Sequence, residues 1–120
     1  MGKKILVIDD DPVGGALMVS RLSKEGHEVV RAVNGEQGLA KAQEFLPALI
    51  ILDIEMPEMN GYTFVGEQRK IDSIKDVPVI VLTSHEENKS IFARKNIKNY
   101  LIKPVNFDIL FSTMNIIFPV

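Results

Sequence analysis

Residues 49–53 read LIILD, four consecutive apolar residues followed by an aspartate, and this stretch decides the fold class. A near-continuous apolar run of this length, with no alternating polar residues, is typical of a strand buried on both faces, as in a parallel sheet. Asp53 then stands at the carboxyl end of that strand. Because ligands of open parallel sheets bind beyond the carboxyl ends of the strands, we expect an α/β protein with a polar site beside Asp53.

Four more short apolar runs flank this stretch, at residues 5–8, 29–33, 79–82 and 100–102. The residues between them have helical spacing, which predicts helices over 11–26, over 35–45, from about 60, over 86–95 and over 107–117. This alternation predicts a doubly wound parallel sheet of five strands with five helices on its two faces. No repeat or linker interrupts the pattern, so residues 1–120 are expected to form a single domain.

Two of the expected helices have unusual sequences. Gly14 and Gly15 fall early in the first helix, where each costs about 1 kcal/mol relative to alanine, so this helix is expected to begin late or to fray. The segment 86–95 has Ile91, Phe92 and Ala93 as its apolar residues, so the fourth helix is expected to be the least firmly packed.

The composition argues against several classes of protein. Apolar residues make up 46% and charged residues 25% of the 120 residues, as in ordinary globular domains. The net charge of −2 and the absence of any Lys or Arg run longer than two argue against direct nucleic-acid binding. No segment approaches the ~20 apolar residues of a membrane span, and none resembles a signal peptide. With no cysteine in the chain, a cytoplasmic location is expected.

Residues able to do phosphoryl chemistry follow four of the five apolar runs, and carboxyl ends of parallel strands meet at one edge of a sheet. Oxygen ligands beside a single lysine suit Mg²⁺ and a phosphoryl group. Asp53, which ends a fully apolar strand, is the best candidate for a carboxylate nucleophile, and the preceding acids are better placed to hold a metal or to cap a helix. The full set is Asp9, Asp10 and Asp11, then Asp53, then Thr83 and Ser84, then Lys103 and Pro104.

Four stretches, in this order, resemble those of response-regulator receiver domains. They are ILVIDDDP at 5–12, DIEMPEMNG at 53–61, VIVLTS at 79–84 and YLIKP at 100–104. The resemblance extends over essentially the whole chain. It implies a flavodoxin-like sheet with the strand order 2-1-3-4-5.

The resemblance also implies roles for the acids and the lysine. Asp53 would be the phosphoacceptor, and Asp10 and Asp53 would contact Mg²⁺ together with the backbone carbonyl of Glu55. Asp9 would assist through water. Lys103 would pair with a phosphoryl oxygen.

Two further residues would form the switch of such a domain. The hydroxyl of Thr83 would move toward the phosphoryl group, and the ring of Tyr100 would turn inward in response. The less favoured alternative for Tyr100 is an ordinary amphipathic ring at the start of a strand. The peptide bond between Lys103 and Pro104 would be cis.

Receivers of this family take phosphate from a sensor histidine kinase or a phosphotransfer protein and then act on a downstream protein. They catalyse their own phosphorylation and dephosphorylation and are not conventional enzymes. Two other functions stay open at this point. One is a receiver-like interaction module that is never phosphorylated. The other is a hydrolase resembling the haloacid dehalogenases, although those need a second aspartate where this chain has Glu55.

Ile109 and Ile116 lie away from the apolar stripe of the last helix. They can form a partner-binding face, including a homodimer through the fourth helix, fifth strand and fifth helix. The alternative is that they cover the neighbouring helix and the sheet edge. His27 and His85 have no ligand-like neighbours, so both are expected to be surface residues and not metal ligands.

Overall fold

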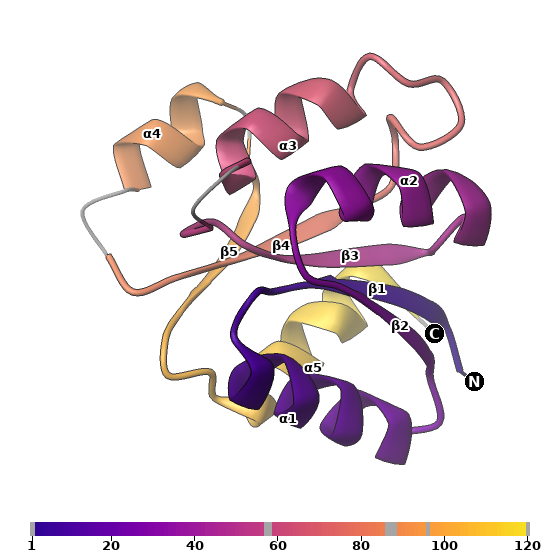
Figure 1. Cartoon of the computed structure of the whole chain (residues 1–120). Helices are drawn as coiled ribbons and strands as arrows, with labels where there is room; N and C mark the ends of the chain where they lie inside the picture. The colour runs from indigo at the N-terminus through magenta and orange to yellow at the C-terminus, as the bar shows by residue number, and fades with distance from the viewer. Residues whose placement is uncertain (1, 57–58, 86–88, 96, 120) are drawn as a thin grey trace.

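A computed structural model of the chain describes residues 2–56, 59–85, 89–95 and 97–119. The elements are β1 (Lys4–Ile8), α1 (Pro12–Lys24), β2 (Glu28–Ala32), α2 (Gly35–Phe45), β3 (Leu49–Asp53), α3 (Gly61–Gln68), β4 (Val79–Thr83), α4 (Lys89–Arg94), β5 (Asn99–Ile102) and α5 (Phe107–Ile117). The strands form one parallel sheet in the order β2-β1-β3-β4-β5 (Figure 1), which confirms the predicted fold class and strand order. None of the helices in this part of the chain is long and apolar enough to cross a membrane.

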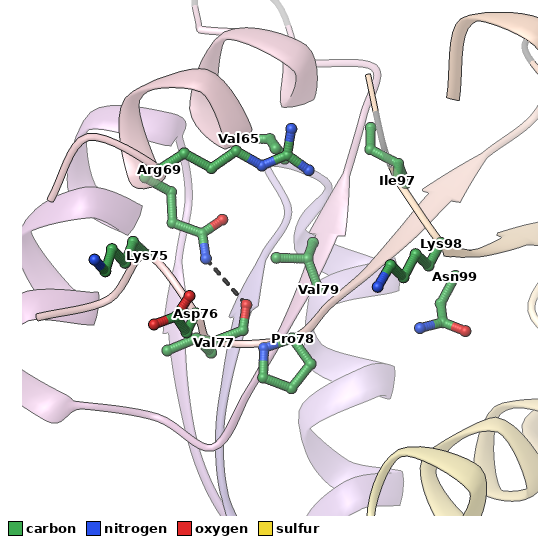
Figure 2. Close-up of a pocket in the computed structure, with 11 residues that line it drawn as sticks. Val65, Arg69, Lys75, Asp76, Val77, Pro78, Val79, Ile97, Lys98 and Asn99 are labelled. Carbon is green, nitrogen blue, oxygen red and sulfur yellow. Dashed lines mark hydrogen bonds between the residues drawn. The ribbon is translucent and has the colours of Figure 1, made fainter. Parts of the chain in front are cut away.

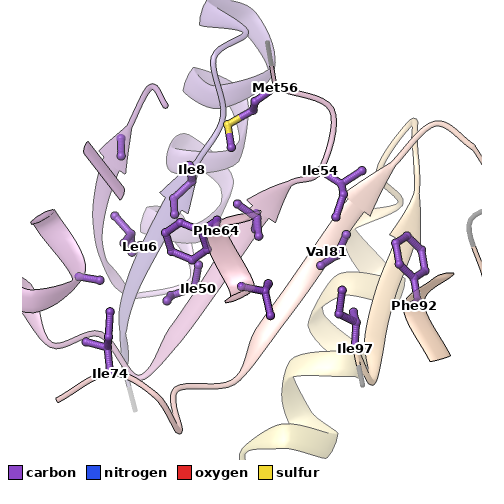
Figure 3. Packing of buried hydrophobic residues seen from close by; sticks show 14 residues of the cluster. Leu6, Ile8, Ile50, Ile54, Met56, Phe64, Ile74, Val81, Phe92 and Ile97 are labelled. Carbon is purple, nitrogen blue, oxygen red and sulfur yellow. The ribbon is translucent and has the colours of Figure 1, made fainter. Parts of the chain in front are cut away.

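The helices cover both faces of the sheet, with α1 and α5 on one side and α2, α3 and α4 on the other (Figure 1). All five residues of the central strand β3 are buried. Ile50 and Leu52 join the cluster around Phe64 (Figure 3), whereas Leu49 and Ile51 join the cluster beneath α1 and α5. Burial on both faces explains why this strand has no alternating polar residues.

Helix α1 begins directly at Pro12, so the prediction that it would begin late was wrong. The side chain of Asp11 accepts hydrogen bonds from the N–H groups of Val13 and Gly14, both at 3.2 Å. Pro12 has no N–H group and suits the first helical position. The N–H groups in the first turn of a helix have no partner within the helix, and the Asp11 side chain accepts from two of them. This cap stabilises the first turn in spite of the two glycines.

The short helix α4 is described from Lys89, and the expected helical residues 86–88 lie outside the described part of the chain. Phe92 is buried and anchors this helix to the sheet and to α3. Its ring lies 4.9 Å from that of Tyr100 and 6.0 Å from that of Tyr62, measured between ring centres. Aromatic packing thus holds the least apolar of the helices in place.

Candidate functional site

The acids expected to form the site lie together at the carboxyl ends of the strands. The strands end toward the left of Figure 1. Asp9 follows β1 and Asp53 ends β3, and the register pairs these strands directly. One carboxylate oxygen each of Asp9, Asp10 and Asp53 lies within 4.8 Å of the others. Asp9 and Asp53 are buried, whereas Asp10 is exposed. The sheet therefore brings three negative charges into one partly buried cluster.

Lys103 supplies positive charge to this cluster from the end of β5. Its Nζ lies 3.0 Å from Oδ2 of Asp53. Its backbone N–H donates to the carbonyl of Thr83 at 2.7 Å, and its peptide bond to Pro104 is cis. Burial favours a lower pKa for Lys103, but the hydrogen bond and charge of Asp53 outweigh it and raise the pKa. Lys103 is therefore charged at neutral pH.

The pKa of Asp9 lies above its ordinary value. Burial is the largest cause and raises the pKa of Asp9, while a hydrogen bond from the Asp11 N–H group to its Oδ1, at 2.9 Å, opposes this rise. The charge of Asp53 raises the pKa further, and Lys103 compensates only in part. The net effect is upward, with burial as its largest cause.

Glu55 connects the site to the end of β4. Its N–H group donates to Oδ1 of Asp53 at 2.9 Å. Its carboxylate accepts from the hydroxyl of Thr83 at 3.1 Å and from both the N–H group and the hydroxyl of Ser84. Nε2 of His85 lies 3.5 Å from the same carboxylate. Burial favours a higher pKa for Glu55, but the hydrogen bonds from Ser84 and Thr83 outweigh it and lower the pKa.

This carboxylate network goes beyond what the sequence predicts, because the resemblance gives Glu55 a metal-contacting carbonyl and a position that tunes phosphate lifetime, but no hydrogen bonds to Thr83 and Ser84. A signal was available: Thr83 and Ser84 present two hydroxyls at the end of the strand next to β3. The register places Leu82 opposite Asp53, so Glu55 and Ser84 each stand two residues beyond a paired position. Because neighbouring strands lie about 4.8 Å apart, the carboxylate of Glu55 and the hydroxyl of Ser84 are within reach of each other.

Tyr100 and the two histidines lie outside the cluster of Asp9, Asp10 and Asp53. The half-buried ring of Tyr100 packs on Phe92 of α4 rather than on the acidic cluster. His85 is exposed, as expected. His27 is half-buried, and its Nδ1 accepts a hydrogen bond from the Lys3 N–H group at 3.0 Å.

A separate cavity of about 480 Å³ lies at the opposite end of β4 (Figure 2). Its lining includes Arg69, Lys75 and Lys98. Beside it, the buried amide of Gln68 donates to the carbonyls of Ile74 at 2.9 Å and Val77 at 3.0 Å. These bonds hold the segment that leads into β4. Because Asp53 stands at the other end of the strands, this cavity is not part of the acidic site.

Comparison with known proteins agrees with this geometry. Residues 5–115 match the response regulator receiver domain family. The chain is 34% identical to the protein PilH of Pseudomonas aeruginosa over 114 residues, which cover 93% of this chain and 94% of PilH. The structure of the chemotaxis protein CheY4 of Vibrio cholerae superposes with a TM-score of 0.89 at 31% identity, covering 98% of this chain and 99% of CheY4.

A third similar structure is the receiver domain of the sensor histidine kinase PA1611 from Pseudomonas aeruginosa, crystallised with a magnesium ion in its active-site cleft. Its TM-score is 0.89 at 24% identity, with both chains covered completely. The chain belongs to the response regulator receiver domain family and is a receiver domain of two-component signalling.

Replacing Asp9 by asparagine should stabilise the protein when no divalent cation is present. The substitution removes a buried negative charge beside Asp53 while its oxygen can still accept from Asp11, so the free energy of unfolding should rise by on the order of 1 kcal/mol. Urea unfolding in EDTA and in Mg²⁺ measures this, and Mg²⁺ should narrow the difference from wild type. The exposed Asp10→Asn is the control with a smaller effect. A wild type more stable than Asp9→Asn in EDTA would contradict the prediction.

The network around Glu55 should make stability depend on pH. Because the pKa of Glu55 is lowered on folding, its contribution is fully present above the ordinary value of 4.5 and is lost as the pH falls through the folded value. Glu55→Gln should therefore be less stable than wild type at about pH 7, with the difference shrinking toward about pH 3. Urea unfolding followed by circular dichroism tests this, with the exposed Glu44→Gln as control. A difference that persists or grows in acid would count against the network.

Proposed function

We propose that Asp53 accepts a phosphoryl group from a phosphohistidine and later loses it to water. A carboxylate oxygen of Asp53 attacks phosphorus, the P–N bond breaks, and its electron pair leaves with the imidazole. Water then attacks phosphorus of the acyl phosphate, which releases inorganic phosphate and restores the carboxylate. The observation that carries this proposal is the position of Asp53, buried at a strand end, 3.0 Å from Nζ of Lys103 and beside two further acids.

The site fits Mg²⁺ in the chemistry of its donors. Asp9, Asp10 and Asp53 offer hard carboxylate oxygens within 4.8 Å of one another, and the backbone carbonyl of Glu55 is proposed to complete the protein ligands. Burial and the charge of Asp53 both disfavour the ionised form of Asp9, and a bound cation would stabilise that form. The bound ion would neutralise phosphoryl oxygens. The magnesium ion in the PA1611 receiver domain supports this assignment.

Lys103 and Thr83 are proposed to contact the phosphoryl group. Lys103 would exchange its bond with Oδ2 of Asp53 for a bond with a phosphoryl oxygen, so its charge stays paired throughout. Thr83 donates its hydroxyl to Glu55 and would transfer that bond to the phosphoryl group. Tyr100, packed on Phe92 next to this strand end, would respond through the aromatic contact with α4.

A histidine kinase or a phosphotransfer protein is the proposed phosphodonor, and the surface of α1 next to the acids suits its docking. Val13 and Leu17 are 77% and 51% exposed, although both are apolar. Leu17 lines a cavity of about 290 Å³ together with Asp9, Lys103 and Phe107. Exposed apolar side chains beside a charged site are typical of interaction surfaces. A cytoplasmic location and the downstream protein stay predictions.

Incubation with Mg²⁺ and acetyl phosphate should attach one phosphoryl group to the wild-type chain. Asp53→Asn should give no labelling, because asparagine lacks the nucleophilic carboxylate. Intact-mass spectrometry measures the added group, and Asp72→Asn, which removes an exposed acid after α3, is the matched control. Labelling of Asp53→Asn to the wild-type extent would exclude Asp53 as the acceptor. An unlabelled wild type that still binds a partner would support the unphosphorylated interaction module.

We also propose that α5 presents a surface for a second copy of the chain. Ile109 and Ile116 are 52% and 78% exposed, which favours a partner-binding surface over the alternative that they cover the neighbouring helix and the sheet edge. Ile102, at the end of β5, is also 38% exposed. These residues belong to the face on which the sequence predicts a homodimer.

Replacing both Ile109 and Ile116 by serine should weaken self-association of the phosphorylated chain. The substitutions remove the two most exposed large apolar side chains of α5, whose burial would drive pairing. Sedimentation velocity after treatment with acetyl phosphate gives the fraction of dimer. Val33→Ser, which changes an exposed apolar residue after β2, is the control. A dimer fraction equal to that of wild type, or a wild type that stays monomeric, would exclude this interface.

A further inference from the structure

Arg31 of β2 reaches under the loop that carries the acids of the site. Its register partner in β1 is Val7, whose side chain faces α1 and α5, so Arg31 is directed to the same face. One guanidinium nitrogen, Nη2, donates to the backbone carbonyls of Asp9 and Asp11, both at 3.0 Å. A single planar group therefore connects the two ends of the turn that contains Asp10.

Gly15 makes room for this arginine. A Cβ atom at position 15 would lie 2.3 Å from Nε of Arg31 and 2.6 Å from its Cζ, closer than any real contact. Glycine in a helix is otherwise unfavourable by about 1 kcal/mol relative to alanine. Gly15 therefore leaves the space that the guanidinium of Arg31 occupies, because any side chain at position 15 would push the guanidinium away from the loop.

We propose that Arg31 is a positioning residue of the cation site, acting through the backbone of residues 9–11. This inference rests on the proposed function, because it assigns Arg31 to the support of the Mg²⁺ site. Arg31 touches neither the carboxylates nor the reacting atoms. It fixes the separation of two carbonyls, and this separation sets where the side chains of Asp9 and Asp10 begin.

Other hydrogen bonds also constrain the loop, among them one from the N–H group of Gly15 in α1 to the carbonyl of Asp11 at 2.8 Å. The N–H group of Asp9 donates to the carbonyl of Ala32 at 3.1 Å, which ties the start of the loop to β2. The N–H group of Asp11 donates to Oδ1 of Asp9 at 2.9 Å, which closes the turn. None of these bonds holds the carbonyl of Asp11 to the sheet, and Arg31 does. Lysine, a point charge on a flexible stem, would hold the two carbonyls less rigidly.

Titration of Mg²⁺ during labelling with acetyl phosphate tests the role of Arg31. In Arg31→Gln the Mg²⁺ concentration for half-maximal rate should rise about 10- to 100-fold, as for other residues that orient metal ligands. The rate at saturating Mg²⁺ should stay within about twofold of wild type, because Arg31 does not contact the phosphoryl group. Arg31→Lys should shift the midpoint less. Lys24→Ala, which removes a surface charge from the far end of α1, should leave it unchanged.

Gly15→Ala provides the second arm of the test. With Arg31 present it should raise the Mg²⁺ midpoint as Arg31→Gln does, because alanine displaces the guanidinium. In the Arg31→Gln background it should add no further shift, since the space is then free. Midpoints equal to wild type in Arg31→Gln and Gly15→Ala, with only the melting temperature lowered, would overturn the proposal.

Calorimetry separates failure of this inference from failure of the proposed function. If the wild type is not labelled by acetyl phosphate, the phosphorylation proposal fails, and Mg²⁺ affinity can still be measured directly on wild type and Arg31→Lys. Weaker binding by Arg31→Lys supports the positioning role. Equal affinities, or no Mg²⁺ binding by the wild type, overturn it.

Discussion

The repulsion among three carboxylates at one end of the sheet is the constraint on which the rest of the structure depends. Two unit charges 4 Å apart repel by about 4 kcal/mol at an effective dielectric constant of 20. The strands that carry Asp9 and Asp53 are buried on both faces and paired in register, so the backbone cannot move these acids apart. Lys103 relieves part of the repulsion through Asp53, and the remaining negative charge makes the site a receptor for cations.

Hydrogen bonds between neighbouring strand ends turn this charged cluster into a coupled unit. Glu55, after β3, holds Thr83 and Ser84 at the end of β4. Lys103, after β5, donates its N–H group to the carbonyl of Thr83. A change of charge on Asp53 therefore acts on groups that already connect three strands. These hydrogen bonds give a physical route by which a change of charge on Asp53 can alter the positions of α4 and α5.

Much of the fold was predictable because the interactions that set it are local in sequence. Continuous apolar runs report burial on both faces, so LIILD predicts a central strand, and β3 is that strand. Asp11 followed by Pro12 predicts the start of a helix, and α1 begins there. The low helix propensity of Gly14 and Gly15 led to a wrong prediction of a late helix start. The Asp11 cap stabilises the first turn, and the guanidinium of Arg31 fills the space next to Gly15.

The sequence by itself determined the strand order of the family, the order of the acids and the lysine along the chain, and the strand ends at which they stand. These follow from apolar periodicity and from short motifs, which depend on neighbouring residues only. The tertiary structure decided which polar groups touch. Arg31 meets the loop of Asp9, and Glu55 meets Ser84, and each of these contacts joins residues that lie far apart in the sequence. Side-chain reach across parallel strands depends on register and twist, and these quantities arise only when the sheet assembles.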